Sequence, residues 1–330
     1  PGVLGLARIA FICPAFYSHL RAFEALGEVL QALGHHVTFL LPSGAGSMVQ
    51  MPGFDIAEVP LPPGYDPEAT IRRAARPRGV FGILRTVKDS ARTTEALCRH
   101  GPDILRERGI EAVVGDELEP AAGLVARHLD LPFASLAAAL PIERDPQMPM
   151  PFLPWPYDTS ERGLSRNRGG EFVGGLLLRR QRDVIEHWAA RFGVPAIEDD
   201  VDCLSDRLRI TQTVASFDFP RPSHSLLRPV GPIRSDVAPI GRPIPAMGER
   251  RRPFVFASLG TLQGHRFDLF RKIAGACKDL DAELLVAHCG GLDPAQAERL
   301  EADWVVDFAD QMAALKRADI CITHGGLNTV

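Results

Sequence analysis

The chain has 330 residues, which at roughly 150 residues per domain predicts about two domains, each large enough for its own core. Hydrophobic residues make up 45% and charged residues 24%, an ordinary globular composition that excludes disordered and fibrous architectures. Lys and Arg number 37 against 41 Asp and Glu, a net charge of −4 that argues against binding to nucleic-acid phosphates.

The six cysteines form no Cys-x-x-Cys pair and several lie in apolar segments, which favours free thiols in a reducing cytoplasm. Arg8 interrupts the first apolar segment and no apolar run reaches about 18 residues, so neither a signal peptide nor a spanning helix is predicted. We therefore expect a cytoplasmic protein. The chain begins at Pro1 without a methionine and stops at Val330, which we interpret as a fragment cut inside its second domain.

The first half alternates short apolar runs with amphipathic segments. We expect strands over 8–13, 36–41, 112–115 and 132–136, and helices over 19–33 and 120–128, the first capped by Ser18. Strand–helix–strand repeats of this kind predict a parallel sheet with helices on both faces. Residues 1–227 are therefore interpreted as a doubly wound α/β domain.

Prolines and glycines crowd together over residues 228–253, which predicts a linker. After it the alternation of apolar and amphipathic segments resumes. We expect strands over 254–258, 283–288, 304–307 and 319–323, and helices over 267–278 and 311–317. Residues 254–330 are interpreted as a second, incomplete α/β domain.

Ligands of parallel sheets bind beyond the carboxyl ends of the strands, so polar residues in those turns carry functional information. His19 follows the first strand and starts a helix, whose N-terminus disfavours imidazolium and keeps the ring neutral. Asp116 follows another strand of the same sheet, where a carboxylate can orient the histidine of a general base. The alternatives are a capping histidine and an aspartate that caps a helix. Glu119 is expected to be a first-turn partner of a helix dipole.

Two glycine-bearing turns follow strands of the second half, one over 258–261 and one over 324–329. Backbone amides that no side chain obstructs can bind a diphosphate, and His324 can add a charge or a hydrogen bond. Ordinary tight turns are the alternative. The sequence lacks a P-loop, a complete Gly-x-Gly-x-x-Gly and a spaced set of metal ligands, so NTPase, dinucleotide and metal sites are not predicted.

These second-half motifs resemble, in order and spacing, the donor-domain motifs of nucleotide-sugar-dependent glycosyltransferases of the GT-B fold. The motifs are Ser258-Leu-Gly-Thr, Phe308-Ala-Asp-Gln and His324-Gly-Gly-Leu-Asn-Thr. More narrowly, nearly the whole chain is similar to the zeaxanthin-glucosylating carotenoid branch of the UDP-glycosyltransferase family. That similarity is carried by Pro14-Ala-Phe-Tyr-Ser-His-Leu-Arg-Ala, Arg92-Thr-Thr-Glu-Ala-Leu-Cys, Glu119-Pro-Ala, Phe256-Ala-Ser-Leu-Gly-Thr-Leu-Gln-Gly-His-Arg and Val306-Asp-Phe-Ala-Asp-Gln.

The resemblance implies two Rossmann-like doubly wound domains that face a cleft, the second truncated. It also implies a hexosyltransferase that moves glucose with inversion from UDP-glucose, a co-substrate, to a hydroxyl of a carotenoid such as zeaxanthin, without a metal or other cofactor. His19 would be the general base and Asp116 its orienting carboxylate. The implied donor-binding residues are Ser258, Gly260, Thr261, Phe308, Gln311, His324, Gly325, Gly326 and Asn328. The family's sugar-binding segment lies beyond Val330, so the donor's sugar is not specified here.

An apolar acceptor requires an apolar surface beside His19. The proline-rich loop over 141–157 is the candidate wall, although a loop packed flat on the domain is an equal alternative. The candidate acceptor-binding residues are Phe16, Met148, Met150, Phe152 and Trp155. Residues 71–92 interleave basic and apolar side chains, which suits peripheral contact with anionic lipid on the inner face of the membrane; a solvated basic helix face is the alternative.

Two other functions stay open at this point. The first is a glycosyltransferase for another lipid, sterol or polyketide acceptor, which a short, bulky pocket would favour. The second is a non-catalytic module of the same fold that binds apolar ligands. In such a module, we expect His19 and Asp116 to lie too far apart for a hydrogen bond.

Overall fold

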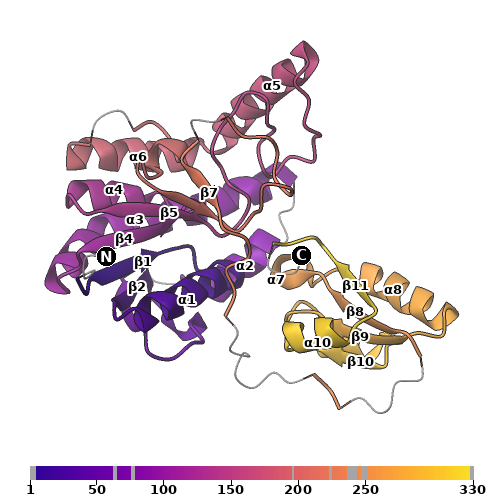
Figure 1. The fold of residues 1–330 in the computed structure, drawn as a ribbon. Coiled ribbons are helices and arrows are strands. Elements are labelled where there is room, and N and C mark those ends of the chain that lie inside the picture. The colour runs from indigo at the N-terminus through magenta and orange to yellow at the C-terminus, as the bar shows by residue number, and fades with distance from the viewer. Residues whose placement is uncertain are drawn as a thin grey trace. The chain divides into compact units, whose positions relative to one another are not determined.

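The computed structural model describes residues 5–61, 65–75, 79–194, 197–222, 225–235, 244–246 and 252–327. The chain folds into two compact units, one made of residues 1–73 and 77–235, the other of residues 74–76 and 236–330. Each unit has its own sheet, its own helices and its own core (Figure 1). Within the described residues, no helix combines the length and the apolar composition needed to cross a bilayer.

The first unit is built on a seven-stranded sheet in the order β3-β2-β1-β4-β5-β6-β7. Its strands are β1 (Arg8–Ile12), β2 (His36–Pro42), β3 (Asp55–Val59), β4 (Ala112–Asp116), β5 (Phe133–Ala137), β6 (Arg209–Thr211) and β7 (Leu227–Pro229). Its helices are α1 (Tyr17–Ala32), α2 (Pro67–Ala75), α3 (Gly79–Glu107), α4 (Ala121–His128), α5 (Glu161–Leu177) and α6 (Arg179–Phe192). Neighbouring strands run parallel, as crossover connections require.

Both faces of this sheet are buried. Successive strand residues point to opposite faces, so Phe11 and Ile12 enter different cores. On one face, the ring of Phe11 packs edge to face on Phe23 of α1 and Phe39 of β2, with centroids 5.3 Å apart in each pair. On the other face, Leu40 packs with Ile12 and with residues of α3, α4 and α6. The doubly wound α/β prediction is confirmed.

Two local predictions differ from the structure. Helix α1 begins at Tyr17, and its N-cap is Phe16, which makes no side-chain capping hydrogen bond. The predicted Ser18 cap is wrong, because Ser18 already lies inside the first helical turn. The segment predicted as a linker begins inside the sheet, because β7 pairs with β6 with Leu227 opposite Arg209.

The second unit has a four-stranded parallel sheet in the order β10-β9-β8-β11. Its strands are β8 (Phe254–Ser258), β9 (Glu283–Ala287), β10 (Trp304–Val306) and β11 (Ile320–Thr323), and its helices are α7 (Gly260–Gln263), α8 (Phe267–Asp279), α9 (Pro294–Glu298) and α10 (Gln311–Arg317). Phe270 of α8 packs in the core of one face and Ala314 of α10 in the core of the other. Each element predicted here is present within one residue of its predicted bounds.

Candidate active site

A histidine and an aspartate meet at the carboxyl edge of the first sheet. β1 pairs with β4 with Ile12 opposite Gly115, so the two strands end side by side. His19 lies in the first turn of α1, after β1, and Asp116 is the last residue of β4. The Oδ2 atom of Asp116 lies 2.7 Å from Nδ1 of His19, a hydrogen-bond distance. The predicted pair is therefore present. A non-catalytic module was expected to hold His19 and Asp116 too far apart for a hydrogen bond, and they are not.

Asp116 does not cap a helix, which was the alternative prediction for this residue. Its Oδ1 atom accepts a hydrogen bond from the backbone N of Leu118 at 2.9 Å, which orders the turn after β4. Helix α4 starts later, at Ala121, with Pro120 as its N-cap. Because Oδ2 binds Nδ1 of His19, that nitrogen carries the proton and Nε2 is the basic one. Within the described residues, Nε2 has no hydrogen-bond partner, so it is available to a substrate hydroxyl.

Burial and charge act in opposite directions on His19. The residue is only 6% exposed, and burial by itself lowers the pKa of the imidazole. The negative charge of Asp116 and its hydrogen bond outweigh burial, so the pKa of His19 is raised above its ordinary value. The helix N-terminus was expected to disfavour the imidazolium; at His19 the charge and the hydrogen bond of Asp116 act in the opposite direction. The result is a stronger base than free imidazole.

Two further buried carboxyls follow Asp116. Glu117 is 2% exposed, and its Oε2 atom accepts a hydrogen bond from the backbone N of Ile142 at 2.9 Å. Burial raises the pKa of Glu117 to about 7, and burial likewise raises the pKa of Glu119 to about 7. Glu119 accepts from the backbone N of Ala121 at 3.2 Å, but it precedes Pro120, the N-cap of α4, so it does not lie in the first turn where it was predicted. Glu117 was not predicted as a site residue. In the sequence, only its position next to Asp116 pointed to it.

In the second unit, the two predicted glycine turns lie side by side. β11 pairs with β8 with Thr323 opposite Ser258, so both turns begin at the same point of the carboxyl edge. Gly260 has a φ of 69°, and a Cβ atom there would lie 2.6 Å from Cε1 of His324. Only glycine therefore lets the His324 ring lie against this turn. Partial burial lowers the pKa of His324, so near neutral pH it offers a hydrogen bond rather than a charge.

The remaining predicted donor-binding residues belong to the same edge of the second sheet. Thr261 lies in α7 directly after β8, and Gly326 lies in the turn after β11. Phe308 lies between β10 and α10, Gln311 is the first residue of α10, and both are half-buried. Asn328 lies outside the described residues. The structure thus brings the described members of the set to one edge.

A second histidine–carboxylate pair, which the sequence analysis did not predict, supports that edge. Nε2 of His288 lies 3.1 Å from Oδ1 of Asp307, and Nδ1 of His288 accepts from the backbone N of Leu292 at 3.2 Å. Burial lowers the pKa of His288, against the opposing charge of Asp307. The backbone N of Cys289 donates to the carbonyl of Asp307 at 2.6 Å. These bonds fix the segment that precedes Phe308.

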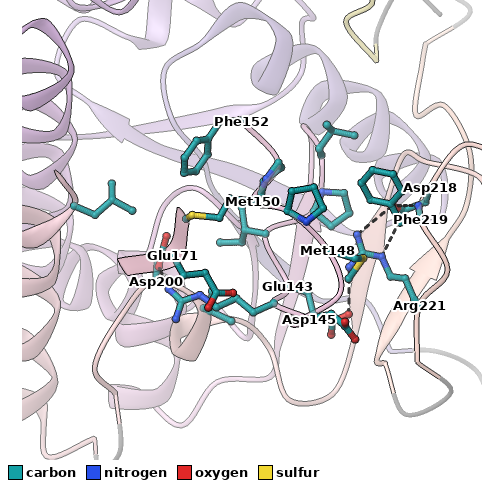
Figure 2. A pocket seen from close by; sticks show the side chains of 18 of the residues that line it. Glu143, Asp145, Met148, Met150, Phe152, Glu171, Asp200, Asp218, Phe219 and Arg221 are labelled. Atoms are coloured by element: carbon teal, nitrogen blue, oxygen red, sulfur yellow. Dashed lines mark hydrogen bonds and ion pairs between the residues drawn. The ribbon is translucent and has the colours of Figure 1, made fainter. Parts of the chain in front are cut away.

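The proline-rich loop after β5 lines a cavity of about 260 Å³ in the first unit. Met148, Met150 and Phe152, three of the predicted acceptor-binding residues, are among its lining residues. Phe217 and Phe219, which follow β6, also line it and were not predicted; two aromatic residues close together after a strand were the available signal. Figure 2 shows Met150 and Phe152 toward one end of the cavity and Phe219 toward the other.

Ion pairs stiffen the polar side of this cavity. Oε1 of Glu143 lies 2.9 Å from Nη1 of Arg209. Nε of Arg221 lies 2.7 Å from Oδ2 of Asp218 (Figure 2). Ile142 lines the same cavity and is the residue whose backbone N binds Glu117. One hydrogen bond therefore connects the cavity wall to the residue next to Asp116.

The other two predicted acceptor residues lie elsewhere. Trp155 is not among the residues that line the cavity; its ring packs under the guanidinium of Arg166, 5.3 Å from the ring centroid, and against Gly170 of α5. The prediction for Trp155 is not supported by this arrangement, because the ring faces the helix. Phe16 lies beside the histidine, with its ring centroid 5.9 Å from that of His19.

Sequence comparison identifies relatives over nearly the whole chain. No protein-family model matches. The chain is 39% identical over 331 residues to a zeaxanthin glucosyltransferase from Pantoea ananas, which covers 98% of this chain and 77% of that protein. A zeaxanthin glucosyltransferase from Pseudescherichia vulneris is also 39% identical, over 332 residues, and covers 98% of this chain and 78% of that protein.

Solved structures with the same fold are glycosyltransferases. The glycosyltransferase of kitacinnamycin superposes with a TM-score of 0.67 at 17% identity, over 98% of this chain and 77% of that one. CalG4, the calicheamicin glycosyltransferase, gives a TM-score of 0.66 at 19% identity, over 98% and 76%. At these identities the likeness shows the fold, which is the GT-B fold of two parallel-sheet α/β domains. The fold and the sequence relatives together show that the chain is an enzyme of the zeaxanthin glucosyltransferase family of GT-B glycosyltransferases.

Proposed function

We propose that this protein transfers glucose from UDP-glucose to a hydroxyl of a carotenoid such as zeaxanthin, with inversion at the anomeric carbon. The relatives supply the class of acceptor and sugar. The observation that carries the chemistry is the buried hydrogen bond between His19 and Asp116 at the carboxyl edge of the first sheet.

In the proposed reaction, Nε2 of His19 takes the proton of the acceptor hydroxyl as its oxygen attacks the anomeric carbon of the donor. The bond from that carbon to the diphosphate oxygen breaks, and UDP leaves with the electron pair. The proton taken up makes His19 an imidazolium, which the charge of Asp116 stabilises at 2.7 Å. Because the same contact raises the pKa of His19, the ring is suited to accept a proton in the transition state.

The proposed donor site is the carboxyl edge of the second sheet. Negative charge builds on the leaving diphosphate, and in this proposal backbone N–H groups around Gly260, Gly325 and Gly326 meet it together with His324. One such preorganised donor is worth about 3 kcal/mol in a transition state. We assign Phe308 to stacking on the uracil ring. Ser258, Thr261, Gln311 and Asn328 complete the proposed contacts.

The proposal includes no metal and no cofactor other than UDP-glucose. In this mechanism the leaving-group charge is met by hydrogen-bond donors of the protein. We therefore expect product formation to continue at an unchanged rate after dialysis against EDTA. A rate that collapses on dialysis and returns with Mg²⁺ or Mn²⁺ would overturn this part of the proposal.

For the acceptor, we propose that the cavity lined by Met148, Met150 and Phe152 receives one apolar end of the molecule. Its volume of about 260 Å³ is near the lower limit of ordinary small-ligand sites, so it suits one ring end group of a long, rigid chain. Phe16, beside His19, is proposed to contact the end that carries the reacting hydroxyl.

We also propose that residues 71–92 contact the anionic inner face of the membrane. The first turns of α3 expose Phe81 to 86%, together with Val80, Ile83 and Leu84. Exposed Arg85, Lys88 and Arg92 line a neighbouring open hollow of about 490 Å³. Apolar side chains beside exposed basic side chains favour an anionic lipid surface.

The test is a product analysis with the full-length protein. UDP-glucose is supplied with zeaxanthin, with a sterol or with an aromatic polyketide in the same detergent, and the products are separated by chromatography with mass detection. We expect a hexosylated pigment from zeaxanthin, with an anomeric configuration opposite to that of the donor. Hexosylation of the sterol or the polyketide alone would overturn the acceptor assignment, and a retained configuration would overturn the mechanism.

A further inference from the structure

Helix α5 carries its large apolar side chains on the outside. Phe172, Val173 and Leu176 are exposed to 69%, 53% and 58%. The buried residues of the helix are small or polar and lie on the opposite side of the helical wheel: Gly163, Asn167 and Gly174. A helix on the surface of a soluble protein has the reverse arrangement, with its apolar stripe toward the core. Figure 1 shows α5 projecting from the rest of the first unit.

The packing of the inner side fixes this orientation. A Cβ atom on Gly163 would lie 2.1 Å from the carbonyl oxygen of Asp158, and one on Gly170 would lie 2.6 Å from the ring of Trp155. The amide of Asn167 donates to the carbonyl of Pro146 at 3.1 Å. Because these close contacts hold the glycine side against the proline-rich loop, the helix cannot rotate its apolar side inward. The packing of the first unit therefore keeps the apolar side of α5 exposed.

The charges around the apolar side are mainly positive. Arg162 and Arg168 lie on or beside the exposed face of α5, and Arg179, Arg180 and Arg182 follow at the start of α6; all five are exposed. The acidic groups in the same segment are exposed Glu161, half-buried Glu171 and exposed Asp183. A helix with large apolar side chains flanked by arginines is complementary to a bilayer with anionic headgroups. A helix that faces water buries none of these apolar side chains and so gains no stability from them.

The proposed acceptor cavity borders the glycine side of α5. Phe152, which is 62% exposed, and Glu171 of α5 both line that cavity. Helix α5 also packs against α3, whose first turns carry Phe81. We infer that α5 lies in the surface of an anionic bilayer and places the mouth of the acceptor cavity at that surface. This inference rests on the proposed function for its purpose, while the binding to lipid can be measured without it.

The test measures sedimentation of the full-length protein with vesicles. One set contains equal parts of phosphatidylglycerol and phosphatidylcholine, and the other contains phosphatidylcholine alone. The test variant is Phe172→Glu/Leu176→Glu. Its matched control is Val29→Glu/Leu33→Glu, which adds the same charge at Val29 of α1 and at Leu33, the C-cap of α1; the two residues are 56% and 63% exposed. Arg168→Gln/Arg180→Gln tests the basic side chains without placing a new charge in an apolar patch.

We expect the parent and the α1 control to bind the anionic vesicles alike, and the Phe172→Glu/Leu176→Glu variant to bind at least about tenfold less. The Arg168→Gln/Arg180→Gln variant should lose most of the preference for phosphatidylglycerol. Equal binding by the parent and the α5 variant would overturn the inference. So would a parent that is dimeric by light scattering and becomes monomeric in the α5 variant with no change in vesicle binding, because the face would then join two copies.

Activity separates this inference from the proposed function. With a short, water-soluble alcohol as acceptor, the α5 variant should match the parent, whereas with zeaxanthin in vesicles it should be slower. A protein that binds vesicles through α5 but glucosylates no acceptor would contradict the proposed function and leave the lipid-binding surface intact. Unfolding curves of each variant confirm that the variants are folded.

Discussion

Replacing Asp116 with Asn removes a charge from the site while keeping its shape. The carboxylate oxygen lies 2.7 Å from Nδ1 of His19, and the two side chains are 1% and 8% exposed, so water cannot replace the lost interaction. Asn can still accept one hydrogen bond, but it does not stabilise an imidazolium. Loss of an orienting carboxylate from a general base costs about 10²- to 10⁴-fold in rate. We expect kcat of Asp116→Asn to fall about 10³-fold, or about 4 kcal/mol of activation free energy.

The pH profile gives an independent measure of the same change. In the parent, charge and hydrogen bonding from Asp116 raise the pKa of His19 against the effect of burial. In Asp116→Asn burial acts alone, so the pKa falls and the acid limb of kcat/KM moves to lower pH. In the parent, the pair stabilises the fold fully below the unfolded-state pKa of about 6.5, and this contribution is lost as pH rises through the raised folded-state pKa.

The assay is steady-state glucosylation of zeaxanthin across a range of pH with saturating UDP-glucose. Asp293→Asn, which changes a capping aspartate of α9, is the matched control and should leave the profile unchanged. An Asp116→Asn protein that keeps kcat within a few-fold of the parent, with the acid limb unmoved, would refute the role given to this pair.

Three further predictions concern buried or crowded groups. Burial raises the pKa of Glu117 from 4.5 to about 7, so the free energy of unfolding should fall by up to about 3 kcal/mol between those pH values; Glu117→Gln should flatten this fall in denaturant titrations, and an unchanged slope would contradict the burial argument. Gly163→Ala should destabilise the fold because its Cβ meets the carbonyl of Asp158, whereas Gly169→Ala, with no atom within 4 Å, should stabilise it by about 0.5–1 kcal/mol in thermal melts. His324→Ala should raise KM for UDP-glucose about tenfold or more through the loss of one hydrogen bond to an anion, and an unchanged KM would count against the donor site.

The elements that the sequence predicted well are those with a simple apolar period. Buried strands such as β1 and β8 are short apolar runs, and α8 and α10 repeat apolar residues every three or four positions. The adjacency of His19 and Asp116 followed from the rule that parallel strands end at one edge. It needed no knowledge of side-chain packing.

The elements that the sequence analysis did not predict have weaker signals. β6 and β7 have only three residues each, too few to show alternation. Helix α5 has glycines on its inner side and Phe172 and Leu176 on its outer side, so its pattern lacks the inward apolar stripe by which a helix is found. Its orientation is set by the close approach of Trp155 to Gly170, a tertiary contact.

Parts of the candidate site depend on contacts between distant segments. The raised pKa of Glu117 arises from burial, which outweighs the hydrogen bond from the backbone N of Ile142, and no local pattern reveals that burial. The cavity combines that loop with Phe217 and Phe219, which lie more than fifty residues further along the chain. Trp155 is large and apolar like the residues that line the cavity, but its ring faces α5, where it packs against Arg166 and Gly170.

The proposed mechanism requires that His19 remove the acceptor proton in glucosyl transfer. The most direct measurement compares the full-length parent with His19→Ala on UDP-glucose and zeaxanthin in detergent, with pigments resolved by chromatography and mass detection, and with UDP-glucose binding checked by calorimetry. We expect a hexosylated pigment from the parent, none from His19→Ala, and equal binding of UDP-glucose by both. Hexosylation by His19→Ala at the parent's rate would contradict this mechanism.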